Sequence, residues 1–264
     1  MQTDPPAPDY ALLDRAGLGR SAFYPRPDRA PAPAGCREHR FEVDPGVELL
    51  ARLYEHDREW PTLLYFHGNG EVASDHDDIA PAYSEIGLNL LVVEFRGYGG
   101  SGGMPGFASL MADARTVAGA AQAWLESEGF RGPRLVMGRS MGALCAQEIA
   151  ANAPEAFRGL ILESGVGGLG RMAQRVAVDG NEAQRLVAAH EAKLRSIRLP
   201  VLMLHGERDQ LILLSAAAEM YDLLATTERE LVVIPDAGHN DILWVGFRQY
   251  FGAIRAFVAR CLAR

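Results

Sequence analysis

The chain has 264 residues, of which 48% are apolar, 34 are acidic and 26 are basic, and its formal net charge is -8. A chain of this length and apolar content can bury a full α/β core and falls in the size range of one large domain. The negative charge repels nucleic acid and anionic lipid surfaces, so neither is an expected partner.

Cysteine usage and hydropathy favour a soluble cytoplasmic protein. The three cysteines, Cys36, Cys145 and Cys261, are too few and too scattered for a disulfide framework or a zinc site, and an odd number suits a reducing compartment. No run approaches the ~18 consecutive apolar residues of a transmembrane helix. The N-terminus also lacks the basic start and apolar run of an export signal. We therefore expect no membrane partner.

Residues 1–35 are rich in proline and alanine, which favours extended or irregular backbone. We expect this segment to be a strap that is partly ordered at best, followed by the main domain over residues 36–264. Phe23 and Tyr24 are candidate anchors to that domain, with a loosely held tail as the alternative.

The main domain reads as alternating strands and helices. Residues 37–43 and 47–54, joined by the turn Asp44-Pro45-Gly46, predict an antiparallel hairpin. Six continuous apolar runs are typical of strands covered on both faces: residues 62–66, 90–95, 135–137, 160–162, 201–204 and 231–234. Apolar residues at helical spacing between 110 and 124 predict one of the intervening helices. This alternation predicts a mostly parallel sheet with right-handed crossovers.

The sequence Gly138-Arg139-Ser140-Met141-Gly142 lies between an apolar run and an alanine-rich helical stretch. A serine on a sharp strand-to-helix turn needs glycine two residues to either side, because a side chain there would collide with the neighbouring backbone. Its hydroxyl is unreactive at neutral pH until a base removes the proton. The pattern therefore predicts a nucleophilic Ser140 that requires a histidine.

The order Ser140, Asp209, His239, with His67-Gly68-Asn69-Gly70 upstream, resembles the α/β-hydrolase superfamily over nearly the whole chain from Arg37. Within it, the chain is similar to small serine hydrolases of the esterase, acyl-thioesterase and aminopeptidase type. The resemblance implies a three-layer α/β sandwich, with a mostly parallel sheet, the N-terminal antiparallel hairpin and a short cap insertion at about residues 165–199.

The resemblance also implies the roles of the site residues. Ser140 is expected to be the nucleophile, His239 the base and Asp209 the acid that orients His239. Glu163 is a rival for the acid, because some members of the superfamily carry it at that strand end, whereas Asp241 is too close to His239 in sequence to orient it easily.

The oxyanion hole is expected to use the backbone N–H groups of Met141 and Asn69, with Gly70 as an alternative donor to Asn69. His67 and Arg96 are expected to be structural, through hydrogen bonds and an ion pair. No cofactor and no metal are expected; the acidic residues at 75–78 suit a helix start better than a metal site.

The cap helix expected over residues 182–195 would cover the pocket with Leu186, Val187 and Leu194, and a plain surface helix is the alternative. A short cap implies a shallow site. We therefore expect a small-molecule acyl substrate, a carboxylic ester or thioester of short to medium length. The alternatives are an aminopeptidase or amidase, in which Glu163 would hold the substrate's ammonium group, and a non-catalytic binding protein of the same fold.

Overall fold

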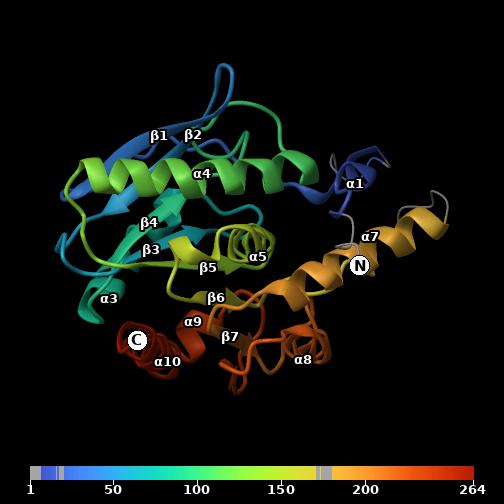
Figure 1. The fold of residues 1–264 in the computed structure, drawn as a ribbon. Helices are drawn as coiled ribbons and strands as arrows, with labels where there is room; N and C mark the ends of the chain where they lie inside the picture. The colour runs from blue at the N-terminus through green and yellow to red at the C-terminus, as the bar shows by residue number, and fades with distance from the viewer. Residues whose placement is uncertain (1–6, 16, 18–20, 171–172, 174–179) are drawn as a thin grey trace.

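The computed structural model describes residues 7–15, 17, 21–170, 173 and 180–264. Within them the chain forms an eight-stranded sheet in the order β1-β2-β4-β3-β5-β6-β7-β8 (Figure 1). The strands are β1 (Cys36–Asp44), β2 (Val47–Tyr54), β3 (Thr62–Phe66), β4 (Asn89–Val93), β5 (Arg134–Arg139), β6 (Leu160–Glu163), β7 (Val201–Gly206) and β8 (Arg229–Ile234). The hairpin β1–β2 is antiparallel, β2 runs antiparallel to β4, and all other neighbours are parallel.

Helices cover both faces of this sheet. They are α1 (Ala11–Arg15), α3 (Ala80–Glu85), α4 (Phe107–Ser127), α5 (Gly142–Asn152), α7 (Gly180–Ser196), α8 (Leu214–Leu223), α9 (Ile242–Val245) and α10 (Phe247–Leu262), with short 3₁₀ helices η1 (Ala73–His76) and η2 (Pro154–Ala156). No helix in these described ranges is both long and apolar enough to cross a membrane.

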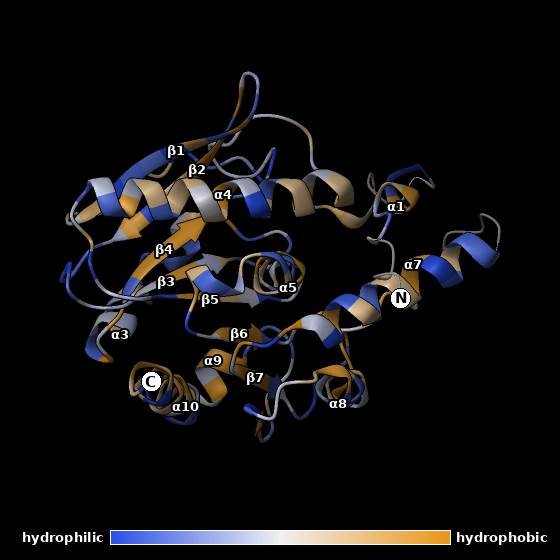
Figure 2. Ribbon diagram, viewed as in Figure 1, coloured by the Kyte–Doolittle hydropathy of each residue, from blue (hydrophilic) through white to orange (hydrophobic). Residues whose placement is uncertain are grey.

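The two faces of the sheet have separate hydrophobic cores. Leu64 and Phe66 of β3 pack with residues of α4, α5 and α7, whereas Leu63 and Tyr65 of the same strand pack with residues of α3 and α10. Side chains alternate between faces along a strand, so a strand covered on both sides must be apolar at every position. Figure 2 shows the hydrophobic central strands, in contrast to the largely hydrophilic β1 at the sheet edge. The predicted three-layer sandwich is confirmed.

The described part of residues 1–35 packs on the main body at several points. Leu12 and Leu13 of α1 are buried, and the Asp14 carboxylate accepts hydrogen bonds from the first N–H groups of α4, at 2.7 and 2.9 Å. Phe23 is 5% exposed and its ring contacts that of Phe107, whereas Tyr24 is 65% exposed. The anchoring ring is therefore Phe23.

The described part of the predicted cap comprises residues 165–170, 173 and 180–199, and most of it is the helix α7. Leu186 and Leu194 are 2% and 0% exposed and belong to the core that also contains residues of α5 and α8. Residues 171–172 and 174–179 of the expected insertion lie outside the described residues. The apolar side chains of α7 thus pack against α5 and α8, and a cap that covers the pocket stays a prediction.

Candidate active site

Ser140 lies on the turn between β5 and α5. Its φ is +51°, in the left-handed region, which costs a residue other than glycine about 1–3 kcal/mol and persists only where the surroundings enforce it. A Cβ atom on Gly138 would collide with the carbonyl group of Gly142, and one on Gly142 with the carbonyl oxygen of Phe66. Both glycines are thus required by packing, and the predicted strand-turn-helix is present.

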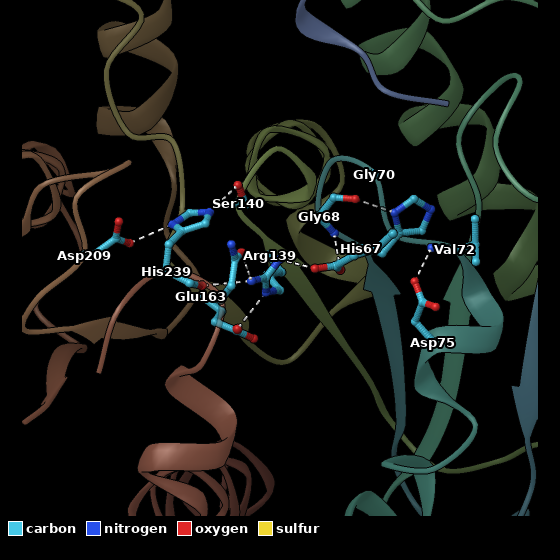
Figure 3. Close-up of polar contacts among 12 residues, drawn as sticks. His67, Gly68, Gly70, Val72, Asp75, Arg139, Ser140, Glu163, Asp209 and His239 are labelled. Carbon is cyan, nitrogen blue, oxygen red and sulfur yellow. Dashed lines mark hydrogen bonds and ion pairs between the residues drawn. The ribbon is translucent and has the colours of Figure 1, made fainter. Parts of the chain in front are cut away.

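The structure brings Ser140, His239 and Asp209 together from three strand ends (Figure 3). The Oγ atom of Ser140 lies 2.9 Å from Nε2 of His239, and Nδ1 of His239 lies 2.7 Å from Oδ2 of Asp209. Asp209 follows β7 and His239 follows β8, so each side chain stands at the carboxyl edge of the parallel sheet, as expected. The Asp209 and His239 residues are 3% and 9% exposed.

The carboxylate of Asp209 is held by a set of donors. Its Oδ1 accepts the N–H groups of Leu211 at 2.9 Å and Ile212 at 2.8 Å, while Oδ2 faces His239. Burial alone would raise the pKa of Asp209, but the hydrogen bond with His239 and that from the Ile212 N–H outweigh it and hold the pKa below its usual value. The group therefore stays ionised at neutral pH and can stabilise an imidazolium.

His205, which the sequence analysis did not single out, also lies against Asp209. Its Nε2 atom lies 3.6 Å from Oδ2 of Asp209 and 2.8 Å from the carbonyl oxygen of Ile212. Burial lowers the pKa of His205, so the ring is neutral and can donate to that carbonyl. The only sequence signal was its place at the end of the strand before Asp209.

The two other carboxylates considered for this role, Glu163 and Asp241, bind groups other than His239. Glu163 is 2% exposed; its Oε1 lies 3.0 Å from Nε of Arg139, and its Oε2 accepts the Tyr250 hydroxyl at 2.6 Å. Asp241 accepts a backbone N–H of its own loop at 2.6 Å. The carboxylate paired with the His239 imidazole is that of Asp209.

The loop after β3 is fixed through the side chain of Asn69. Its Nδ2 donates to the carbonyl of Ala22 at 2.6 Å, and its Oδ1 accepts from the Tyr24 N–H at 2.9 Å and the Tyr98 hydroxyl at 2.6 Å. The side chain of Asn69 is therefore used to hold this loop against residues 22–24 and Tyr98, and a role of its backbone N–H in an oxyanion hole stays a prediction. Sequence analysis gave no sign of these bonds, because they join residues more than 20 positions apart.

His67 and Arg96 have the structural surroundings that were expected. The His67 ring is fully buried, with Nδ1 2.8 Å from the Gly68 carbonyl and Nε2 3.3 Å from Glu94. Burial would lower the pKa of His67, but Glu94 more than offsets it. Arg96 donates two hydrogen bonds of 2.7 Å to Asp113. Throughout the described chain, no group of three or more His, Cys, Asp or Glu residues could hold a metal ion.

Two further residues near the site, Glu71 and Arg139, were missed by sequence analysis. Figure 3 shows the Arg139 side chain between the His239 side and the His67 side of the site. The only sequence signal was a charged residue at the end of two predicted strands, Arg139 and Glu163, which the register of β5 and β6 pairs in the structure.

Comparison with known proteins supports this reading of the fold. A family model described as serine aminopeptidase, S33 matches residues 59–188. The uncharacterized protein Rv2307c of Mycobacterium tuberculosis is 30% identical over 251 residues, which cover 90% of this chain and 86% of that protein. Protein bem46 of Schizosaccharomyces pombe is 30% identical over 207 residues, covering 75% of this chain and 67% of the relative.

Among solved structures, the Pyrococcus furiosus esterase Pf2001 is similar with a TM-score of 0.71 and 20% identity, covering 90% of this chain and 99% of the esterase. At that identity the likeness concerns the fold. Together with the two relatives and the family model, it identifies the chain as a member of the α/β-hydrolase superfamily and as a hydrolase.

Proposed function

We propose that this protein is a serine hydrolase that cleaves a carboxylic ester or thioester of short to medium acyl length through an acyl-enzyme. The observation that carries the proposal is the hydrogen-bonded series from Ser140 through His239 to Asp209, with distances of 2.9 and 2.7 Å. A nucleophile, a base and an orienting acid within hydrogen-bond reach are what acyl transfer by serine requires.

The reaction begins when the Oγ atom of Ser140 attacks the carbonyl carbon and gives its proton to Nε2 of His239. The imidazolium that forms donates its Nδ1–H to the ionised Asp209. The carbonyl oxygen becomes an oxyanion, which accepts the backbone N–H groups of Met141 and Asn69. His239 then returns the proton to the leaving alcohol or thiol as the tetrahedral intermediate collapses to acyl-Ser140.

Deacylation repeats these steps with water as the nucleophile. His239 takes a proton from the water molecule, the hydroxide adds to the acyl carbon, and the same two N–H groups stabilise the second oxyanion. The proton returns to Oγ of Ser140 when the carboxylic acid leaves. No cofactor is needed for either half of this reaction.

An ester or thioester is favoured over an aminoacyl substrate. The description of the matched family model favours an aminopeptidase as the second candidate. Such an enzyme needs an accessible carboxylate for the substrate's ammonium group, and Glu163, the residue considered for it, is buried and bound to Arg139 and Tyr250. A buried carboxylate that already has its partners is a poor receptor for a second cation.

A modest acyl group is favoured by the surroundings of the site. Leu186 and Leu194 of the expected cap would have to enclose a long acyl chain, but both side chains are buried in the hydrophobic core. The exposed Leu211 and Leu213 lie in the loop after Asp209 and offer apolar surface on an open face. An acyl chain on such a surface is covered over a short length only.

The proposal is tested by labelling with a fluorophosphonate probe and by hydrolysis of p-nitrophenyl esters and aminoacyl amides. The wild-type protein should be labelled covalently, and Ser140→Ala should keep its circular dichroism spectrum but lose labelling and nearly all turnover. Labelling or full turnover in Ser140→Ala would overturn the serine mechanism. Faster cleavage of aminoacyl amides than of esters would favour the aminopeptidase instead.

A further inference from the structure

Arg139 is the residue before Ser140, and its guanidinium contacts two loops and the end of the neighbouring strand β6 at the carboxyl edge of the sheet. Its Nη2 donates to the backbone carbonyl of His239 at 2.8 Å and to Oδ1 of Asn240 at 3.1 Å. Its Nε donates to Glu163 at the end of β6 at 3.0 Å, and its Nη1 pairs with Glu71. The side chain is 11% exposed.

Glu71 extends these contacts to the loop that carries Asn69. One of its carboxylate oxygens pairs with Arg139, and the other accepts the backbone N–H of Gly68 at 2.7 Å. A Cβ atom on Gly68 would collide with Nη1 of Arg139, so the guanidinium packs directly against this loop (Figure 3). We call residues 67–71 the oxyanion loop and residues 235–241 the histidine loop.

These contacts require an arginine in particular. The guanidinium is planar and rigid, and here Nε binds the end of β6, Nη1 binds Glu71 and Nη2 binds the carbonyl of His239. A lysine at this position would have one nitrogen on a flexible stem, which cannot reach all three of these segments in a fixed geometry.

The charges of the cluster also support this arrangement. Burial alone would lower the pKa of Arg139, but the carboxylates of Glu163 and Glu71 outweigh it and raise the pKa, so the guanidinium stays charged. The second oxygen of Glu163 is satisfied by the Tyr250 hydroxyl. A buried ion cluster with its hydrogen bonds filled holds its members in one geometry.

We propose that Arg139 is a positioning residue that couples the oxyanion loop to the histidine loop, and so sets the distance between the oxyanion donors and the His239 base. The inference rests on the proposed serine mechanism, because it gives these two loops their catalytic meaning. Both loops must be correctly placed in the transition state, where a shift of about 1 Å can cost about 100-fold in rate. Substrate binding to the open face depends on Arg139 far less.

The test is Arg139→Lys, with Arg208→Lys as a matched control. Arg208 pairs with Asp236 of the histidine loop, but both side chains are more than 60% exposed, at 68% and 65%. We expect Arg139→Lys to lower kcat about 100-fold with KM within about threefold of wild type. Hydrogen–deuterium exchange should become faster in both the oxyanion loop and the histidine loop. Arg208→Lys should leave kcat, KM and exchange in the oxyanion loop unchanged.

A second variant, Glu71→Gln, removes the ion pair between Arg139 and the oxyanion loop and keeps an oxygen that can accept the Gly68 N–H. It should lower kcat, leave KM unchanged and increase exchange in the oxyanion loop, which it contacts directly. If Arg139→Lys does not fold, a wild-type kcat in Glu71→Gln overturns the proposal by itself. The proposal is overturned if the variants lose thermal stability while kcat is kept, or if Arg139→Lys loosens only one loop. Failure of the serine mechanism is seen separately, as a wild-type protein that the fluorophosphonate does not label.

Discussion

The backbone N–H of Ser140 donates a hydrogen bond of 2.8 Å to the carbonyl oxygen of Glu163, at the end of the neighbouring strand. The carbonyl oxygen of Ser140 in turn accepts the N–H of Val166 at 3.3 Å. The peptide groups on both sides of Ser140 are thus held by the end of β6 and by the residues that follow it. The position of the Ser140 hydroxyl is therefore set by the sheet as well as by its own helix.

Asp209→Asn should lower kcat about 10⁴-fold with a modest change in KM. An amide has one oxygen, which cannot accept hydrogen bonds both from the backbone N–H groups and from Nδ1 of His239, as the two carboxylate oxygens do. His239 is then no longer held in the tautomer with a proton on Nδ1, and it loses the negative charge that stabilises its protonated form. Steady-state kinetics with a p-nitrophenyl ester measures this effect. Asp241→Asn, in the same loop as His239, is the control and should keep wild-type kcat; if Glu163→Gln rather than Asp209→Asn produced the loss, the acid would be Glu163.

Ester chain length should show a maximum at short to medium acyl groups. Each methylene that the site buries contributes about 0.8 kcal/mol of binding, and each one beyond it contributes nothing. We would measure kcat/KM for p-nitrophenyl esters from acetate to palmitate, with Ser140→Ala as the blank. A steady rise to palmitate would mean that other parts of the molecule complete a deep acyl tunnel.

Acid should destabilise the protein through His190. This ring is 0% exposed; its Nδ1 lies 3.0 Å from the Tyr10 hydroxyl and its Nε2 lies 3.2 Å from the Gly167 carbonyl. Lys193 donates to the oxygen of the same hydroxyl, so the hydroxyl proton of Tyr10 is donated to Nδ1 of His190. A neutral imidazole with an unprotonated Nδ1 can accept this proton. Burial, together with the Lys193 charge, lowers the pKa of His190 to about 3.

The direction of this pH effect on stability follows from the pH at which His190 is protonated in the unfolded and in the folded protein. The unfolded chain protonates this histidine below about pH 6.5, whereas the folded protein does not until about pH 3. The free energy of unfolding should therefore fall as pH falls through this window, by about 2 kcal/mol between pH 7 and pH 5 from His190 alone. Urea unfolding at the two pH values should show a smaller fall for His190→Gln, and equal falls would contradict the assignment.

Asp14→Ala should lower the free energy of unfolding by about 1 kcal/mol, because it removes the side-chain acceptor of the first N–H groups of α4. The exposed Asp78 is a suitable control, and Asp78→Ala should change the free energy by less than about 0.5 kcal/mol. Urea unfolding at neutral pH measures both. Equal stability of wild type and Asp14→Ala would mean that the N-terminal segment contributes no cap to α4.

The sequence was sufficient to predict the eight strands, the hairpin and the turn at Ser140. These features depend on local rules: a continuous apolar run predicts a strand covered on both faces, and glycines two residues either side of a serine predict the sharp turn. Asp209 and His239 were predicted from the chain order of the superfamily, and the structure places His239 beside Ser140 and Asp209 on the other side of the His239 ring.

Only the tertiary structure decided which carboxylate faces His239 and what holds the surrounding loops. Glu163 ends β6 and Asp209 follows β7, and the choice between them depends on which groups already bind each carboxylate, namely Arg139 and Tyr250 for Glu163. In the same way, the resemblance placed a cap at about residues 165–199, but only the tertiary structure showed that Leu186 and Leu194 of α7 pack into the core. Sequence patterns specify an element's period and its ends, whereas its partners depend on the order of strands in space, which differs from their order in the chain.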